Sequence, residues 1–226
     1  MLCRPQGFES KALGGDSQFQ CRFSIRSGPI GVDDSEFHVN PAIPTTDRRP
    51  YPDPGSVPNM SDFLPDLTSW NCFACGQDHP KGLRLRFTAP EQDRIRSEFQ
   101  VSKDHVGLGM IVHGGIVATV FDETMVWALY RWRYQPHVTA RMEQRFRGVV
   151  EAGTPLVAEA WIATDRGRRR TVEAHIFGAD DPKRILAEAS GTYLPAATAA
   201  FDSLPQIQQD EMAAVFDHFR ALDESE

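Results

Sequence analysis

The sequence has few cysteines, no long apolar run and no excess of basic residues. Four cysteines in 226 residues are too few for a disulfide scaffold, which is typical of a reducing compartment, so we expect a cytoplasmic protein. No apolar run approaches the roughly 18 residues that a membrane span needs, so no span is expected. The formal net charge of −7 argues against an overall basic nucleic-acid binder.

The charge is unevenly distributed. Residues 1–59 hold 6 basic and 7 acidic side chains, residues 60–195 hold 17 of each, and residues 196–226 hold 1 and 7. The acidity therefore lies mostly in the C-terminal tail. A neutral central domain can still gather arginines locally to hold a phosphorylated small ligand.

Residues 1–59 lack any sustained period of two or 3.6 residues, and prolines crowd between Pro29 and Pro65. This predicts an arm that is either disordered or an upstream extension that the cell does not use. A transit peptide is the weaker interpretation, because Glu9 and Asp16 interrupt the basic N-terminus.

Residues 60–195 show the patterns of regular structure. Leu83, Leu85 and Phe87 alternate with polar residues, which predicts a half-buried strand, and residues 94–101 alternate similarly. After a glycine-rich loop, residues 116–132 favour a buried helix. Four further strands are predicted, at residues 138–150, 156–164, 171–178 and 185–194.

The order of these elements predicts an α+β fold. An antiparallel sheet of about six strands, wrapped around one central helix, satisfies the order strand, strand, long helix, four strands. Residues 196–226 form an acidic tail whose apolar residues recur at helical spacing, which indicates an amphipathic helix. These residues are Ile207, Met212, Val215, Phe216, Phe219 and Leu222.

Residues 113–123 are the most informative stretch. His113-Gly114-Gly115 opens the predicted helix, and Asp122 and Glu123 interrupt its apolar sequence. A carboxylate in an apolar helix needs a partner or a function. Glycines at a helix start leave backbone N–H groups accessible, which suits a carbonyl oxygen that becomes negative.

This pattern resembles a known active site. His-Gly-Gly, six residues and then Asp is similar to the signature of hotdog-fold acyl-CoA thioesterases of the phenylacetate-degradation type. Residues 71–83 look like the leader of many members, so the resemblance covers residues 71–194. It implies hydrolysis of an acyl-CoA thioester to the free acid and coenzyme A.

The resemblance also implies roles for individual residues. Asp122 would be the general base or the nucleophile, Gly114 the oxyanion donor, and His113 the support of the turn, with Gly115 beside the substrate. Glu123 is one place past the catalytic position and would point about 100° away around the helix. The alternative for Asp122 is an ordinary salt-bridged helix residue.

Thr139 is the second candidate. In a related branch with mammalian thioesterase superfamily members, a threonine opens the strand after the central helix and positions the water, and Thr139 sits at the matching place. Another branch uses a hydroxyl one turn beyond the carboxylate, but that position is Val126 here. Threonine is also common in strands without any role in catalysis.

Arginines form the third group. The resemblance places Arg145, Arg147 and Arg168 at coenzyme A, whose phosphates match guanidinium groups, and it places Val157 and Ala158 along the pantetheine arm. A solvated sheet face is the alternative interpretation for the arginines.

Cys72 and Cys75 form a Cys-x-x-Cys pair, but a tetrahedral zinc site needs two more ligands, and no second paired motif follows. We therefore expect structural cysteines, no metal and no cofactor.

The resemblance implies a homodimer or a dimer of dimers. The predicted fold agrees with this, because one sheet around a single helix leaves an edge strand exposed, and an exposed edge usually finds a partner. Each site would combine two chains, with Asp122 of one chain facing Thr139 of the other. A catalytically silent domain that binds acyl-CoA or an aromatic ligand remains an alternative, as does a hydratase or dehydratase on the same fold.

Overall fold

The computed structural model describes residues 20–23, 63–91 and 93–224. Their elements, in chain order, are β1 (Gln20–Phe23), β2 (Thr88–Glu91), β3 (Arg94–Phe99), a 3-10 turn (Lys103–His105), β4 (Val106–Leu108), β5 (Ile111–Val112), α1 (Gly114–Arg133), β6 (His137–Phe146), β7 (Leu156–Arg166), β8 (Arg169–Gly178), β9 (Asp181–Pro195), α2 (Thr198–Asp202) and α3 (Gln206–Glu224).

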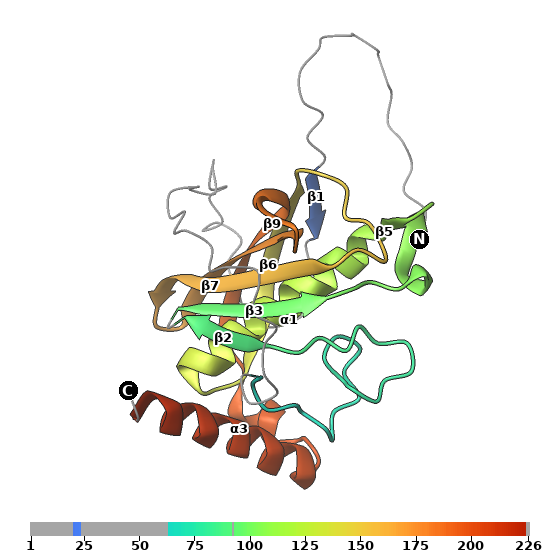
Figure 1. Cartoon of the computed structure of the whole chain (residues 1–226). Helices are drawn as coiled ribbons and strands as arrows, with labels where there is room; N and C mark the ends of the chain where they lie inside the picture. Colours follow the sequence, from blue (N-terminus) through green and yellow to red (C-terminus); the bar gives the residue numbers. More distant parts are fainter. Residues whose placement is uncertain (1–19, 24–62, 92, 225–226) are drawn as a thin grey trace.

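One antiparallel sheet wraps around part of the central helix (Figure 1). Its order is β1-β6-β9-β8-β7-β3-β2, and α1 packs against β3, β6, β7, β8 and β9. Six of these strands, β2, β3 and β6 to β9, belong to the central domain. The predicted α+β fold, a sheet of about six strands around one helix, is therefore confirmed.

Local sequence explains both ends of α1. The Nδ1 atom of His113 accepts a hydrogen bond from the Gly115 amide at 3.0 Å, which caps the N-terminus. Tyr134 adopts the left-handed conformation that ends the helix. Buried residues occur around most of the helix, as expected where other elements cover it on several sides. They are Val117, Val120, Phe121, Thr124, Met125, Trp127, Ala128, Leu129 and Arg131.

The described segment before β2, residues 63–87, is called the leader from here on, and it differs from the predicted strand at residues 83–87. Leu85 and Phe87 are buried as expected, but the assigned strand starts only at Thr88. The backbone before it bonds to the leader itself, because Leu83 and Leu85 donate to the carbonyls of Phe73 and Ala74 at 2.9 Å. The alternation of apolar residues therefore predicted correctly which side chains are buried, but it did not predict that the segment lies outside the sheet. The predicted glycine-rich loop also contains the short β4-β5 pair.

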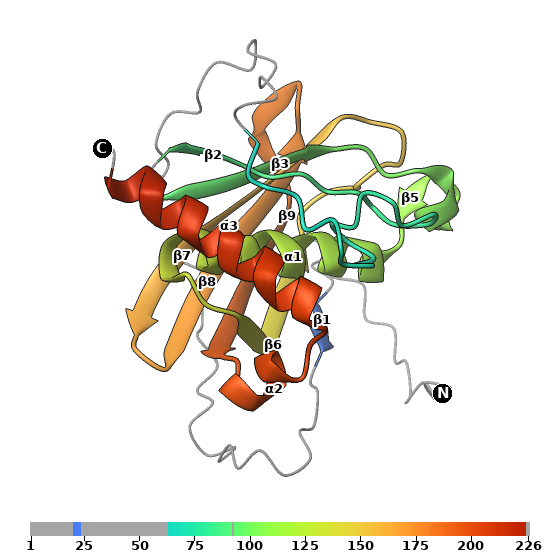
Figure 2. The same ribbon diagram turned by 90° about the horizontal axis from the view of Figure 1, so that it is seen from below.

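The acidic tail forms α3, as its spacing predicts, and α3 crosses the side of α1 that the sheet leaves uncovered (Figure 2). The ring of Phe219 lies edge-on to Trp127 at 6.5 Å, and the ring of Phe216 lies edge-on to Tyr130 at 5.7 Å. These aromatic residues of α1 therefore belong to the packing between helices. The Glu211 carboxylate accepts hydrogen bonds from the leader at Thr68 and Ser69.

The N-terminal arm contributes one described segment. β1 pairs with the outer edge of β6, with Gln20 opposite Arg145 and Phe23 opposite Met142. The rest of the arm lies outside the described residues, so its predicted disorder remains a prediction. None of the helices in the described ranges is long and apolar enough to cross a membrane.

Candidate active site

Asp122 lies on the side of α1 that faces β6 and β9. Its Oδ1 atom accepts a hydrogen bond from Thr139 Oγ1 at 2.6 Å and another from the Tyr193 hydroxyl at 3.2 Å. Thr139 and Tyr193 are register partners in neighbouring strands, so both side chains point to the same face of the sheet. Among the described residues, Asp122 Oδ2 has no hydrogen-bond partner.

The two predicted residues Asp122 and Thr139 thus come together within one chain. The expectation that Asp122 would face Thr139 of a second chain is therefore wrong, because the two residues face each other in the same chain. The short turn after α1 folds β6 back along its own helix, and this brings Thr139 to Asp122 of the same chain.

Sequence reasoning missed Tyr193. Its side chain is fully buried, and burial, followed by the Asp122 carboxylate, raises the pKa of Tyr193 well above its usual value. The hydroxyl therefore stays protonated and donates to Asp122. Gly191 makes room for this ring, because a Cβ atom at that position would lie 2.5 Å from Tyr193 Cε2. A glycine inside a strand, two residues before a tyrosine, was the available signal.

Within the described residues, the start of α1 offers one backbone donor that is not already hydrogen-bonded. The Gly115 amide is taken up by His113 Nδ1, so His113 holds the turn as predicted. The Gly114 amide has no partner among the described residues. Its carbonyl accepts from Gln144 Nε2 at 3.4 Å, and the Phe146 ring would lie 3.5 Å from a Cβ atom at Gly114. A contact of Gly115 with substrate remains a prediction.

Arg145 and Arg147 lie together but apart from Asp122. Both reach Glu188 Oε1, Arg147 at 2.7 Å and Arg145 at 3.5 Å. Glu188 alternates with the core residues Ala187 and Ala189 along β9, so it points away from α1. Within one chain the sheet therefore separates these arginines from Asp122.

The remaining predicted contacts are spread over β7 and β8. Val157 and Ala158 are buried in β7, and Ala158 belongs to the core. Arg168 is exposed in the β7–β8 turn. That turn lies near the end of α1, because Arg133 pairs with Asp165 at 2.5 Å. Arg168 is thus far along the helix from Asp122, and its role at coenzyme A remains a prediction.

Glu123 points away from Asp122, toward the leader, as its place on the helix predicts. Trp127 Nε1 donates to Glu123 Oε1 at 3.1 Å, and the Cys72 sulfur lies 3.8 Å from Oε2. Burial, and then the Cys72 sulfur, raises the pKa of Glu123 to about 7. A hydrogen bond from the Cys75 thiol lowers the pKa of Cys72 to about 5.

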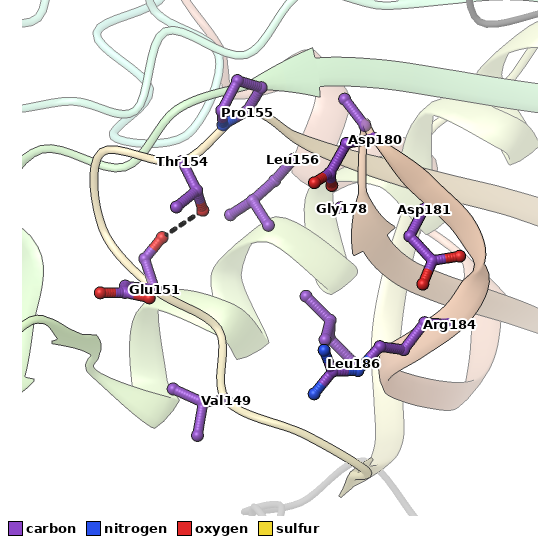
Figure 3. Close-up of a pocket in the computed structure, with 11 residues that line it drawn as sticks. Val149, Glu151, Thr154, Pro155, Leu156, Gly178, Asp180, Asp181, Arg184 and Leu186 are labelled. Atoms are coloured by element: carbon purple, nitrogen blue, oxygen red, sulfur yellow. Dashed lines mark hydrogen bonds between the residues drawn. The ribbon is translucent and has the colours of Figure 1, made fainter.

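A surface cavity of about 740 Å³ lies elsewhere, between the β6–β7 connection and the β8–β9 turn (Figure 3). Its charged lining comprises Glu151, Asp180, Asp181 and Arg184. Three carboxylates against one guanidinium do not favour a phosphorylated ligand. We therefore place the candidate active site at Asp122 and not in this cavity.

Comparisons with known proteins match part of the chain to one family. A model described as the thioesterase superfamily matches residues 109–185, a segment that contains all of α1, β6, β7 and β8. A search of curated proteins finds no match.

Solved structures share the fold. The chain is similar to a crystal structure of a thioesterase superfamily protein at 18% identity and a TM-score of 0.51, over 55% of this chain and 60% of the other. It thus spans less than two thirds of that protein's length. Two structures of thioesterase superfamily member 2 are also similar, each at 18% identity. The match to the zebrafish protein covers 53% of this chain and 90% of that protein, with a TM-score of 0.48. The match to the Mus musculus protein covers 47% of this chain and 84% of that protein, with a TM-score of 0.42. Residues 109–185 thus match the thioesterase superfamily, and the chain has the hotdog fold.

Proposed function

We propose that this chain hydrolyses acyl-CoA thioesters, with Asp122 as general base or nucleophile. The observation that supports it best is the hydrogen bonding of the Asp122 carboxylate. Two hydroxyl donors, Thr139 and Tyr193, hold Oδ1, whereas Oδ2 has no partner in the described part of the chain. An oriented carboxylate with one free oxygen can take a proton from water or attack a carbonyl carbon directly.

The Gly114 amide is the proposed donor to the thioester oxygen. It stands at the positive end of α1 and, among the described residues, is not already hydrogen-bonded. Such a donor stabilises the negative charge that develops on the oxygen in the transition state. His113 would act indirectly, because its cap on the Gly115 amide fixes the turn.

These two groups require two chains for one site. Gly114 and Asp122 are eight residues apart on α1, which separates their Cα atoms by about 12 Å at a rise of 1.5 Å per residue. Reacting atoms must approach to about 3–3.5 Å, and one thioester cannot span the longer distance. We propose a homodimer in which Asp122 and Thr139 of one chain act with Gly114 of the partner subunit.

Coenzyme A would be held by arginines. Arg145 and Arg147 share the single carboxylate of Glu188, which leaves one positive charge in excess for a phosphate. Arg168 is exposed and could also reach a phosphate, and Val157 and Ala158 are the proposed neighbours of the pantetheine arm. Loss of an arginine should raise KM more than it lowers kcat. The reason is that a phosphate far from the reacting atoms is bound equally well in the ground state and in the transition state.

Asp122→Asn tests the proposal. It preserves shape but removes the base, so we expect kcat for acyl-CoA esters of varied chain length and aromaticity to fall about a hundredfold or more. Thr139→Ala should reduce kcat less, and Glu123→Gln less still. If Glu123→Gln lowered kcat strongly while Asp122→Asn left kcat nearly unchanged, the assignment of Asp122 would be contradicted.

The same variants separate an enzyme from a silent acyl-CoA binder. A non-hydrolysable acyl-CoA thioether should bind to the wild type and to Asp122→Asn with similar affinity, while only the wild type turns over a thioester. A wild-type protein that binds the thioether tightly but hydrolyses no ester of the series would favour the binding module.

A further inference from the structure

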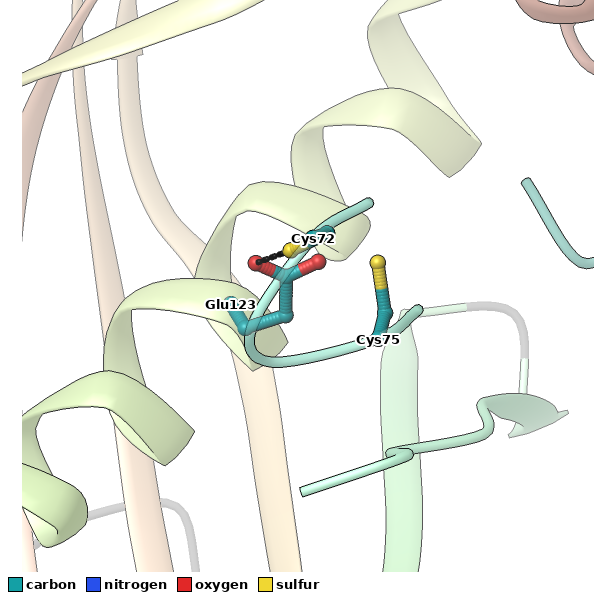
Figure 4. Close-up of side chains that lie close together, drawn as sticks. All are labelled: Cys72, Cys75 and Glu123. Atoms are coloured by element: carbon teal, nitrogen blue, oxygen red, sulfur yellow. Dashed lines mark hydrogen bonds between the residues drawn. The ribbon is translucent and has the colours of Figure 1, made fainter. Parts of the chain in front are cut away.

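Three side chains that could bind a metal ion converge beside the candidate active site. Cys72 and Cys75 come from the leader and Glu123 from α1, and their ligand atoms all lie within 4.8 Å of one another (Figure 4). We propose that Cys72, Cys75 and Glu123 bind one zinc ion, with a water molecule as the fourth ligand. This reverses the expectation of structural cysteines without a metal.

The spacing of the ligand atoms suits tetrahedral zinc. Bonds of about 2.3 Å to sulfur and about 2.1 Å to oxygen place two sulfurs about 3.8 Å apart and a sulfur and an oxygen about 3.6 Å apart. The Cys72 sulfur lies 3.8 Å from Glu123 Oε2, close to that separation. The other separations do not exceed 4.8 Å, so small side-chain adjustments would bring the three ligand atoms to these distances.

The leader backbone already has the form of a ligand-holding turn. The Ala74 amide lies 3.3 Å from the Cys72 sulfur and donates to it, and the Gly76 amide donates to the Cys72 carbonyl at 3.0 Å. A Cβ atom at Gly76 would lie 2.5 Å from that carbonyl oxygen, so the turn requires glycine there. Both sulfurs of this turn lie within 4.8 Å of a Glu123 carboxylate oxygen.

The third ligand is held by its own hydrogen bond. Trp127 Nε1 donates to Glu123 Oε1 and leaves Oε2 on the side of Cys72. Such outer contacts orient a metal ligand before the ion arrives. Trp127 is itself buried against Phe87 and Phe219, so the orientation of the carboxylate is fixed by the core.

Charge and ligand type favour zinc. None of the ion pairs in the described ranges includes Glu123, although its carboxylate is partly buried beside two sulfurs. A divalent cation would neutralise most of the charge of two thiolates and one carboxylate. Thiolates select zinc over magnesium or calcium, and a mixed sulfur and oxygen set fits its borderline softness.

The proposed ion would fasten the leader to α1. Glu123 follows Asp122 directly but projects about 100° away around the helix, toward Cys72 and away from Thr139. The ion would thus position α1 and stabilise the leader, and it would stay clear of the proposed reaction at Asp122.

Cobalt titration tests the site directly. The full-length protein is stripped of metal by a chelator under reducing conditions and titrated with Co²⁺, whose thiolate bonds give a charge-transfer band. We expect saturation at one ion per chain, loss of the band on addition of Zn²⁺, and a thermal midpoint that rises with Zn²⁺.

Matched variants decide the ligand set. Cys72→Ser and Cys75→Ser should abolish the band, and Glu123→Gln should weaken affinity at least tenfold. A Cys3→Ser/Cys21→Ser double variant should bind like the wild type. An absent band in the wild type would overturn the proposal, as would equal affinity in Glu123→Gln or Cys72→Ser. Asp122→Asn should bind metal normally, which keeps this result separate from the test of hydrolysis.

Discussion

At the scale of single residues, His137 shows how burial fixes a protonation state. Its Nδ1 atom lies 2.9 Å from the Gln135 carbonyl oxygen and its Nε2 atom 2.9 Å from Arg170 Nη1, so Nε2 accepts a hydrogen bond from the guanidinium. Burial, assisted by the charges of Arg170 and Arg133, lowers the pKa of His137 to about 4, although the Gln135 carbonyl and Asp165 oppose this shift.

This depressed pKa predicts a loss of stability in acid. The unfolded chain binds a proton at its histidine near pH 6.5 and the folded chain only near pH 4, so protons favour unfolding between these values. We expect the free energy of unfolding to fall by about 2 kcal/mol from pH 7.5 to pH 5 through this residue.

Urea unfolding at the two pH values measures this contribution. His137→Gln keeps an acceptor for Arg170 but cannot titrate, so its stability should be lower at pH 7.5 and should change less on acidification. Parallel pH profiles for the variant and the wild type would contradict the assignment. His218→Gln, on the outer side of α3, is the control for exposed histidines.

The residues of the site differ in how far the sequence could predict them. Asp122, Gly114 and His113 lie within ten residues, so their spacing along one helix was readable directly. Tyr193 reaches Asp122 from 71 residues away, and only the register of β9 against β6 brings it there. Glu123 was recognised as pointing elsewhere, but its meeting with Cys72 depends on the path of the leader.

At the scale of elements, α3 is part of the core. Phe219 is fully buried and contacts Trp127 of α1, while Met212, Val215 and Phe216 are also buried. The Glu211 carboxylate adds hydrogen bonds to the leader at Ser69. The tail therefore closes the side of α1 that the sheet leaves uncovered.

Phe219→Ala should consequently destabilise the whole domain. Removal of a fully buried phenylalanine costs about 3–5 kcal/mol, and the thermal midpoint should fall accordingly. Leu222→Ala, one turn later and 36% exposed, is the matched control and should change the midpoint little. A similar small effect for both variants would show that α3 does not hold the core together.

Element types were more predictable than element ends. The apolar run of residues 116–132 predicted nearly the full length of α1. The helix is slightly longer, because Gly114 and Gly115 belong to its first turn. The alternation at residues 83–87 was misread because apolar residues alternate in any extended segment packed on a core. The Leu85 amide donates to the Ala74 carbonyl, so this segment pairs with the chain around Ala74 and not with a strand of the sheet. No local sequence pattern distinguishes these two kinds of pairing.

At the scale of the whole molecule, we expect a second copy to bind at the outer edge of β6. Edge strands present unpaired backbone groups, and β6 stands at the edge of the central six-stranded sheet. In this chain β1 covers part of that edge, at Met142 to Arg145. A partner copy and β1 would therefore compete for the same backbone groups.

Removal of residues 1–59 tests both the independence of the core and this competition. The buried core lies within residues 64–219, so a chain that starts at Met60 should fold, keep its activity and unfold within a few degrees of the full chain. Because the deletion uncovers β6, light scattering over a concentration series should show a larger fraction of dimer. Cys21→Pro in the full chain removes a β1 backbone donor opposite Gln144 and should shift the equilibrium the same way. A fall in the dimer fraction, or a large fall in the thermal midpoint, would mean that the arm supports the fold or the assembly.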